Sequence, residues 1–324
     1  MFAKLIKSSV PVNFIFLPII IFAGWWLFYT GMNPLKWSTE KSILLPLIPV
    51  HVFSHPWCGI IAITFLLFTS LLMIPFTIKY FHNTSGNLLP AVLYLALMAP
   101  SQWLFETGPA CIASFFCMLA LRFIFETYHQ KRVFHYGFMA GILSSLATLI
   151  YLPSILLLLV CWTGLILLRS FKFREFLIVV IGFLIPLLFT HAVFFILNRE
   201  QQLLFLIKNT LVKNLFPDFK IYQIIWLSLI SALCIWGVLK SITSDSLKKI
   251  VFRRYFETLA LALVLFIGVF IFLITDNGLL TMLILPLSFI LAIALSSIKK
   301  TIYASLFIFI LILIQIATQI SFVF

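Results

Sequence analysis

The stretch ETLALALVLFIGVFIFLITDNGLLTMLILPLSFILAIALSSI, residues 257–298, decides the fold of this chain. As a single helix it would extend about 63 Å at 1.5 Å of rise per residue, whereas the hydrocarbon core of a bilayer is about 30 Å thick. The run must therefore fold back, and Asp276-Asn277-Gly278 near its middle is a helix-stopping sequence. Basic residues flank both ends, which predicts that both ends lie on one side of a membrane.

Two further stretches, 88–127 and 134–168, have the same organisation. Their predicted turns are Glu106-Thr107-Gly108-Pro109 and Tyr151-Leu152-Pro153, because glycine and proline end helices. The positive-inside rule then makes the basic side of all three hairpins cytoplasmic. The basic flanking residues are Lys79, Arg122, Lys131, Arg132, Arg169, Lys172, Arg174, Arg253, Arg254, Lys299 and Lys300.

The composition supports the same class of protein. The chain is 63% hydrophobic and 10% charged, with a mean hydropathy of +1.19, as is typical of polytopic membrane proteins. Five more apolar stretches, 12–29, 56–77, 176–197, 221–239 and 301–322, bring the prediction to about eleven crossings, within a range of roughly 9 to 12. We expect an all-α transmembrane bundle with a cytoplasmic N-terminus, in which residues 1–324 form one integral membrane domain and no soluble domain is present.

The charge distribution and the cysteine positions argue against a nucleic-acid partner, a disulfide framework and a metal site. On this topology 16 of the 22 Lys and Arg residues are cytoplasmic and 6 are external, so lipid headgroups account for the net charge of +13 and no nucleic-acid partner is expected. The five cysteines lie in predicted crossings without CxxC spacing, so neither a disulfide framework nor a metal site is expected. His51 and His55 have helical i, i+4 spacing for a transition metal, but Pro49 and Pro56 interrupt a regular helix there.

Nucleotide and protease motifs do not occur: the sequence has no Walker A, GxGxxG or HExxH pattern. Lys4 and Lys7 precede an apolar run of spanning length, which predicts an uncleaved anchor. Any energy must then come from a lipid-linked donor, an ion gradient or a partner protein. We expect localisation in the bacterial inner membrane.

Two segments are predicted to lie along the external surface. Segment 31–55 has Ile43, Leu44, Leu45 and Leu47 to dip into the membrane beside Trp37. Segment 199–220 carries a leucine-rich stripe together with cations. Arg199, Lys208 and Lys213 are candidates for binding a lipid phosphate, and snorkelling of these side chains from an interfacial helix is the alternative interpretation.

Acidic residues are the candidate catalytic groups, because the chain has only nine. Glu106 and Asp276 lie in two predicted external hairpin tips, and His191 lies near the external end of its crossing. A carboxylate partly removed from water there could act as a general base or bind a divalent cation. The alternative is helix capping by Glu106 and ordinary turn chemistry at Asp276.

The run Ser8-Ser9-Val10-Pro11-Val12-Asn13 and the block YLPSILLLLVCWTGLILLRSFKFREFLIVVIGFLIPLLF, residues 151–189, resemble an uncharacterised family of bacterial polytopic inner-membrane proteins. That resemblance implies a class and a location but no activity. The middle region is also distantly similar to multispanning glycosyltransferases of the GT-C architecture, which have a catalytic acid in a first external loop with surface helices. Glu40 stands at the matching position, where that family normally has Asp, and this chain lacks the soluble C-terminal domain of many members.

The GT-C similarity implies that Glu40 activates an acceptor while Arg199, Lys208 and Lys213 hold the phosphate of a polyprenyl-linked sugar. Three functions therefore remain: an enzyme acting on a lipid-linked substrate at the external face, a non-catalytic subunit with envelope protein partners, and a transporter. A transporter is least favoured because the sequence shows no repeat and few ionisable residues at the centres of the crossings.

Overall fold

The computed structural model describes residues 42–47, 57–81, 88–98, 108–128, 130, 133–169, 172–201, 203, 205–206, 221–242, 250–272, 277–298, 307 and 311. Within these residues the regular structure is helical. The α-helices are α3 (Trp57–Phe81), α4 (Leu89–Met98), α6 (Gly108–Glu126), α7 (Phe134–Ile150), α8 (Leu156–Leu168), α9 (Phe173–Ile196), α11 (Ile221–Ile242), α12 (Ile250–Phe272) and α13 (Asn277–Ser296), and the short 3-10 helices are η1 (Leu45–Leu47) and η3 (Leu152–Ile155).

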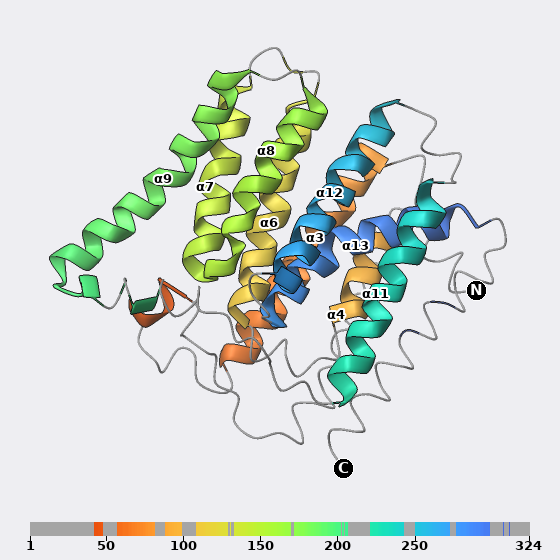
Figure 1. Cartoon of the computed structure of the whole chain (residues 1–324), viewed down its shortest axis with the longest axis horizontal. Coiled ribbons are helices and arrows are strands. Elements are labelled where there is room, and N and C mark those ends of the chain that lie inside the picture. The colour runs from red at the N-terminus through yellow and green to blue at the C-terminus, as the bar shows by residue number, and fades with distance from the viewer. Residues whose placement is uncertain are drawn as a thin grey trace.

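The turns expected within the three long apolar stretches coincide with helix boundaries. α6 begins at Gly108, η3 separates α7 from α8, and α12 ends at Phe272 before α13 begins at Asn277. α12 packs against α13, and η3 and α8 pack back against α7 (Figure 1). Helix-stopping residues inside an apolar run were therefore sufficient to place these turns.

Four helical segments within the described residues are long and apolar enough to cross a membrane: Gly59–Phe81, Gly108–Glu126, Phe173–Ile196 and Gly278–Ser296. The chain thus has the helices of an integral membrane protein. Shorter apolar helices accompany them, among them α4, α7 and α8. The total of about eleven crossings and the GT-C arrangement remain predictions.

α9 and α13 occupy opposite environments in the bundle. The apolar core of α13 is 100% buried, enclosed by α12, α11, α4 and α6. The corresponding part of α9 is only 22% buried, and this helix packs mainly on α7 (Figure 1). α13 is therefore the central helix of the described bundle, and α9 lies at its periphery.

Glycines set the contact between α7 and α9. A Cβ atom at Gly141 would clash with the backbone carbonyl oxygen of Val179, and one at Gly182 would clash with that of Phe138. Gly137 and Gly141 have the small-xxx-small spacing that lets membrane helices approach closely. The two backbones touch because neither helix has a side chain at the crossing.

Polar side chains inside the bundle bond mainly to backbone. Thr69, Thr77 and Thr148 each donate to the carbonyl oxygen four residues earlier, at 2.7–2.8 Å. Tyr94 on α4 and Ser114 on α6 share a buried hydrogen bond of 3.0 Å, which links two helices. These contacts satisfy polar groups where water is absent.

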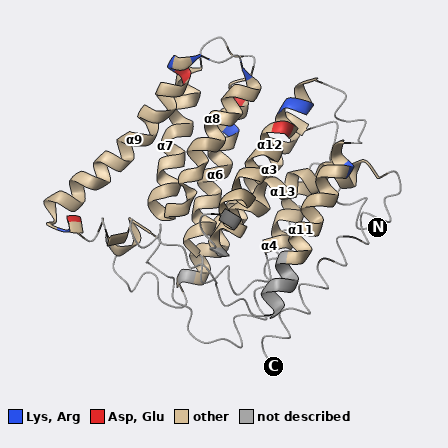
Figure 2. Cartoon of the chain, viewed as in Figure 1, with Lys and Arg blue, Asp and Glu red and all other residues tan. Residues whose placement is uncertain are grey.

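Charged residues gather at one end of the bundle, where α9 and α12 begin and α3, α6 and α8 end (Figure 2). We call this the charged end and the opposite end the far end. Of the described charged residues, only Arg199 and Glu200 lie at the far end. The predicted one-sidedness of the hairpin flanks is thus confirmed for the described part of the chain. The charged-end residues are Lys79, Arg122, Glu126, Arg169, Lys172, Arg174, Glu175, Lys240, Arg253, Arg254 and Glu257.

Candidate functional site

A small group of apolar side chains joins four parts of the chain at the far end. Ile43, Leu149 and Phe194 are buried together, and Leu44 and Leu203 pack against them. We call these five residues the far-end cluster. They come from segment 42–47, from the end of α7, from the end of α9 and from the residues that follow α9. The cluster therefore unites both segments that the sequence predicted to lie along the external surface.

Backbone hydrogen bonds anchor segment 42–47 on α7. The N–H groups of Ile43 and Leu44 both donate to the carbonyl oxygen of Leu149, at 3.0 Å each. The last carbonyls of a helix have no partner within the helix, so this oxygen is available as an acceptor. The hydroxyl of Ser42 donates to the same carbonyl at 3.4 Å and accepts from the N–H of Leu45 at 3.1 Å.

The far end of α9 turns sharply before the next helical segment. Asn198 has a φ of 55°, and the N–H of Arg199 donates to the carbonyl oxygen of Phe194 at 2.9 Å, a pattern that closes helix C-termini. Helical residues resume at Glu200, and Leu203 reaches the far-end cluster. Arg199 and Glu200 are exposed beside this turn.

A second contact at the far end joins two of the expected hairpin turns. A Cβ atom on Gly278 would lie 2.5 Å from the hydroxyl oxygen of Tyr151 and 2.7 Å from the ring carbon that carries it. Tyr151 is buried in the turn between α7 and α8, while Gly278 lies in the first turn of α13. The tyrosine ring packs directly on the backbone because Gly278 has no side chain.

Of the six candidate site residues, the structure describes Arg199. Glu40, Glu106, Asp276, Lys208 and Lys213 lie outside the described residues, as do His51 and His55. His191 is exposed on α9. Ser42, Leu149 and Tyr151 position the far-end contacts, and the sequence pattern did not single out any of them for that role. Their only sequence signal is their place beside predicted turns and surface segments.

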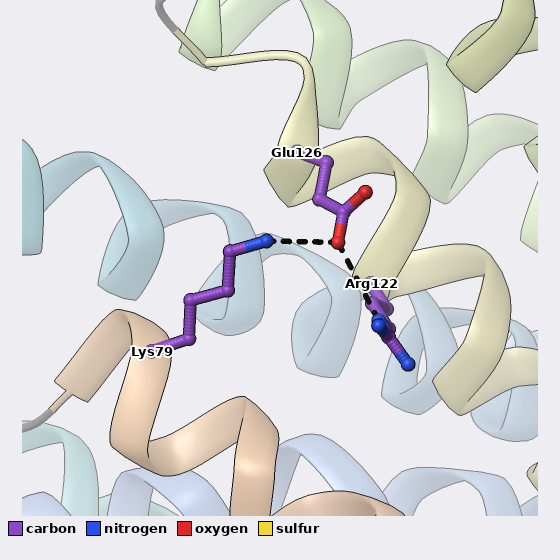
Figure 3. Close-up of polar contacts among 3 residues, drawn as sticks. All are labelled: Lys79, Arg122 and Glu126. Carbon is purple, nitrogen blue, oxygen red and sulfur yellow. Dashed lines mark hydrogen bonds and ion pairs between the residues drawn. The ribbon is translucent and has the colours of Figure 1, made fainter.

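An ion-paired triad lies at the charged end (Figure 3). The Lys79 Nζ atom on α3 and the Arg122 Nε atom on α6 both contact Glu126 Oε1, at 2.9 and 3.5 Å. Lys79 and Arg122 are 56% and 48% exposed, whereas Glu126 is 17% exposed. Two helices therefore present half-exposed cations to one largely buried carboxylate.

Aromatic rings form a layer beside this triad, from residues next to Lys79 and Glu126 in the sequence. The rings of Phe125 and Tyr255 stack with centroids 4.8 Å apart, and the Tyr80 ring meets both edge-on at 5.4 and 5.2 Å. The Lys79 Nζ atom lies 5.3 Å from the centroid of the Tyr80 ring. The layer joins α3, α6 and α12 just inside the charged end.

The other described carboxylates at the charged end are ion-paired as well. Arg169 contacts Glu175 at 3.4 Å and donates to the carbonyl oxygen of Gln130 at 2.7 Å, and the Arg169 and Glu175 side chains are only 13% and 10% exposed. Arg253 contacts Glu257 at 2.9 Å in a more exposed pair. Because the described acids at this end already have cationic partners, this end offers no free general base among them.

Metal-binding groups do not cluster in the part of the chain that the structure describes, where no group of three His, Cys, Asp or Glu residues could hold an ion. Cys111, Cys117, Cys161 and Cys234 are buried thiols that form no disulfide with one another.

Comparison with known proteins identifies a family. Residues 40–323 match the model described as "Family of unknown function (DUF6427)". No curated protein and no solved structure matches the chain. The match covers segment 199–220, residues 40–55 of segment 31–55, and every described residue.

Proposed function

The chain belongs to this family of unknown function, and we propose that it is a membrane enzyme of the bacterial inner membrane that acts on a polyprenyl-phosphate-linked sugar at the far end. In this proposal the far end is external and the reaction is a glycosyl transfer like that of GT-C enzymes. The observation that carries the proposal is the far-end cluster, in which Ile43 and Leu44 from one predicted surface segment and Leu203 from the other pack at the ends of α7 and α9.

Sequence position links the candidate acids to these contacts. Glu40 precedes the buried Ser42 by two residues, and Asp276 precedes the buried Gly278 by two residues. Glu106 likewise stands two residues before Gly108, the first residue of α6. This closeness in the sequence supports the choice of these three acids for the proposal.

The proposed chemistry assigns one role to each group. Glu40 accepts the proton of the acceptor hydroxyl, whose oxygen forms the new bond to the anomeric carbon as the bond from that carbon to the phosphate oxygen breaks. Polyprenyl phosphate leaves, and Arg199, Lys208 and Lys213 offset its charge. Glu106 and Asp276 are the acids that would bind a divalent cation beside the leaving phosphate.

A comparison of glycans tests this proposal. Lipid extracts and cell envelopes are analysed by mass spectrometry in cells that carry the wild-type protein, the Glu40→Gln variant or the Glu200→Gln variant. We expect Glu40→Gln to accumulate one polyprenyl-linked sugar at normal protein level, because it removes the base and keeps the side-chain size. Glu200→Gln, the matched control on an exposed far-end acid, should leave the profile unchanged. An unchanged profile in Glu40→Gln would exclude the role of Glu40.

A second candidate is a non-catalytic subunit of an envelope assembly. The peripheral position of α9 favours it, because the apolar surface of this helix is mostly free of contact with the described bundle. Purification in native lipid discs distinguishes the two functions. A subunit should recover protein partners in fixed stoichiometry, whereas the enzyme can purify alone and retain transferase activity.

A further inference from the structure

The triad of Lys79, Arg122 and Glu126 has an excess positive charge at the membrane surface. Among the described carboxylates, Glu126 accepts from cations on two different helices, α3 and α6 (Figure 3). Both cations are half-exposed, and ion pairs in such positions contribute little free energy because water screens them. The exposed parts of Lys79 and Arg122 are therefore accessible to a second anion.

The depth of the triad matches that of lipid phosphates. Lys79 is in the last turn of α3, and Arg122 lies one turn before the end of α6. Tyr80 and Tyr255 lie in the aromatic layer beside the triad, and tyrosines are enriched at the level of the headgroups in membrane proteins. The apolar lengths of α3 and α6 continue inward from this layer.

An apolar track lies beneath the two cations along the seam between α3 and α6. Phe68 is eleven residues before Lys79 and Phe115 is seven before Arg122, spacings that place each ring within about 20° of its cation around the helix. The two rings contact each other, with centroids 6.4 Å apart, and Phe68 is 50% exposed. An acyl chain below a phosphate at the triad would meet these rings.

We propose that the α3–α6 seam binds an anionic phospholipid, with its phosphate on Lys79 and Arg122 and an acyl chain along Phe68 and Phe115. Glu126 is the intramolecular anion that competes with the phosphate for the two cations. Arginine and lysine both bind phosphate through charge-assisted hydrogen bonds, and Arg122 can do so with two N–H groups. This site lies at the opposite end from the proposed transferase site and does not depend on it.

Lipid titration of the purified protein tests the site. Native mass spectrometry measures the dissociation constant of added phosphatidylglycerol for the wild type and for single variants in detergent. Lys79→Gln and Arg122→Gln should each weaken binding about fivefold, because one cation near a lipid phosphate contributes roughly 1 kcal/mol. Glu126→Gln should tighten binding, because it removes the competing anion and keeps both cations.

Arg253→Gln is the matched control. Arg253 is at the same end and has its own i, i+4 glutamate, but Glu257 is its partner on a single helix. This variant changes the charge of the charged end equally and should leave binding within twofold of the wild type. Equal losses in Arg253→Gln and Lys79→Gln would overturn the proposal, as would weaker binding in Glu126→Gln.

Two further measurements distinguish a bound phospholipid from a bound phosphate ion. Phe68→Ala should weaken phosphatidylglycerol binding, and inorganic phosphate at equal ionic strength should not raise the melting temperature of the wild type. Stabilisation by inorganic phosphate as large as that by phosphatidylglycerol would overturn the lipid assignment. Each variant's melting temperature without lipid shows whether its fold is intact, and Glu126→Gln tests the site even where loss of a cation lowers stability.

Discussion

Two glycines determine how closely α7 and α9 approach. At Gly141 and Gly182 each helix presents only a hydrogen atom to the other helix's backbone. Gly141→Ala should destabilise the protein by about 2 kcal/mol, since the added methyl group must push two packed backbones apart. The melting temperature in detergent measures this change.

Gly268 on α12 is the control for that substitution. A Cβ atom at Gly268 would meet nothing within 4 Å. Gly268→Ala should therefore keep or slightly raise the melting temperature, because alanine favours helix more than glycine does by up to about 1 kcal/mol. Equal effects of the two substitutions would show that close packing at Gly141 does not hold α7 against α9.

The Arg169–Glu175 pair holds the start of α9. Both side chains are nearly buried, and Arg169 also bonds to the carbonyl of Gln130. Glu175→Gln should destabilise the protein by about 3 kcal/mol, because it leaves the Arg169 charge buried without its anion. Denaturant unfolding in mixed micelles measures the change.

Glu257→Gln is the companion measurement, because Glu257 pairs with Arg253 in a more exposed position. Water solvates Arg253 when its partner is lost, so little change in unfolding free energy is expected. If Glu175→Gln and Glu257→Gln change the unfolding free energy by the same amount, burial of Arg169 does not contribute to stability.

The sequence placed these charges at one end but could not pair them. The rule that cations flank cytoplasmic turns needs only order along the chain, which is why Arg169, Arg174 and Arg253 were predicted on one side. The contact of Arg169 with the carbonyl of Gln130 joins two different loops. Such pairing depends on how the hairpins pack, and no local pattern encodes it.

Among the elements, the hairpin turns were predictable because glycine and proline act locally on the backbone. The docking of segment 42–47 on Leu149 was not, although its leucines and isoleucine were expected to enter an apolar environment. The segment donates hydrogen bonds to a carbonyl oxygen that has no partner within α7. Which residue carries that carbonyl depends on where α7 ends.

Contact between the α7–α8 turn and the start of α13 can be tested by a double-variant cycle. Gly278→Ala should destabilise the protein by about 2 kcal/mol, since a methyl group there overlaps the buried ring of Tyr151. In a Tyr151→Leu background the same change should cost much less, because the ring is absent. The melting temperatures of the four proteins give the coupling energy.

Additive effects of the two changes would mean that Tyr151 does not pack on Gly278. Gly268→Ala in both backgrounds controls for the general effect of adding a methyl group to a helix.

For the molecule as a whole, the one-sided distribution of charge predicts an orientation in the membrane. Arg174 and Glu200 are exposed at opposite ends of the α9 segment. A membrane-impermeant maleimide should label a Glu200→Cys variant in intact cells and should label Arg174→Cys only after permeabilisation. The wild type serves as the background control, and its Cys111, Cys117, Cys161 and Cys234 are buried.

Labelling of both variants, or of Arg174→Cys alone, would contradict the predicted orientation. The second result would place the charged end outside and move the proposed transferase site to the cytoplasmic face.

Membrane class was predictable from hydropathy, but the position of each helix in the bundle was not. The candidate spans in α9 and α13 have the same mean hydropathy, yet one is 22% and the other 100% buried. Lipid tails and leucine side chains are equally apolar, so hydropathy cannot distinguish a lipid-facing helix from an enclosed one. The candidate acids of the far end stay predictions for a different reason, because they lie outside the described residues.

The enclosed position of α13 has a consequence for biosynthesis. α13 follows its neighbours α4, α6, α11 and α12 in the sequence, so it leaves the ribosome after all of them. The earlier helices enter the bilayer before α13, and lipid occupies the space between them. α13 displaces this lipid when it is inserted. A nascent chain that stops before residue 277 lacks α13, the central helix of the bundle. Synthesis of α13 is therefore the step that commits the bundle to assembly.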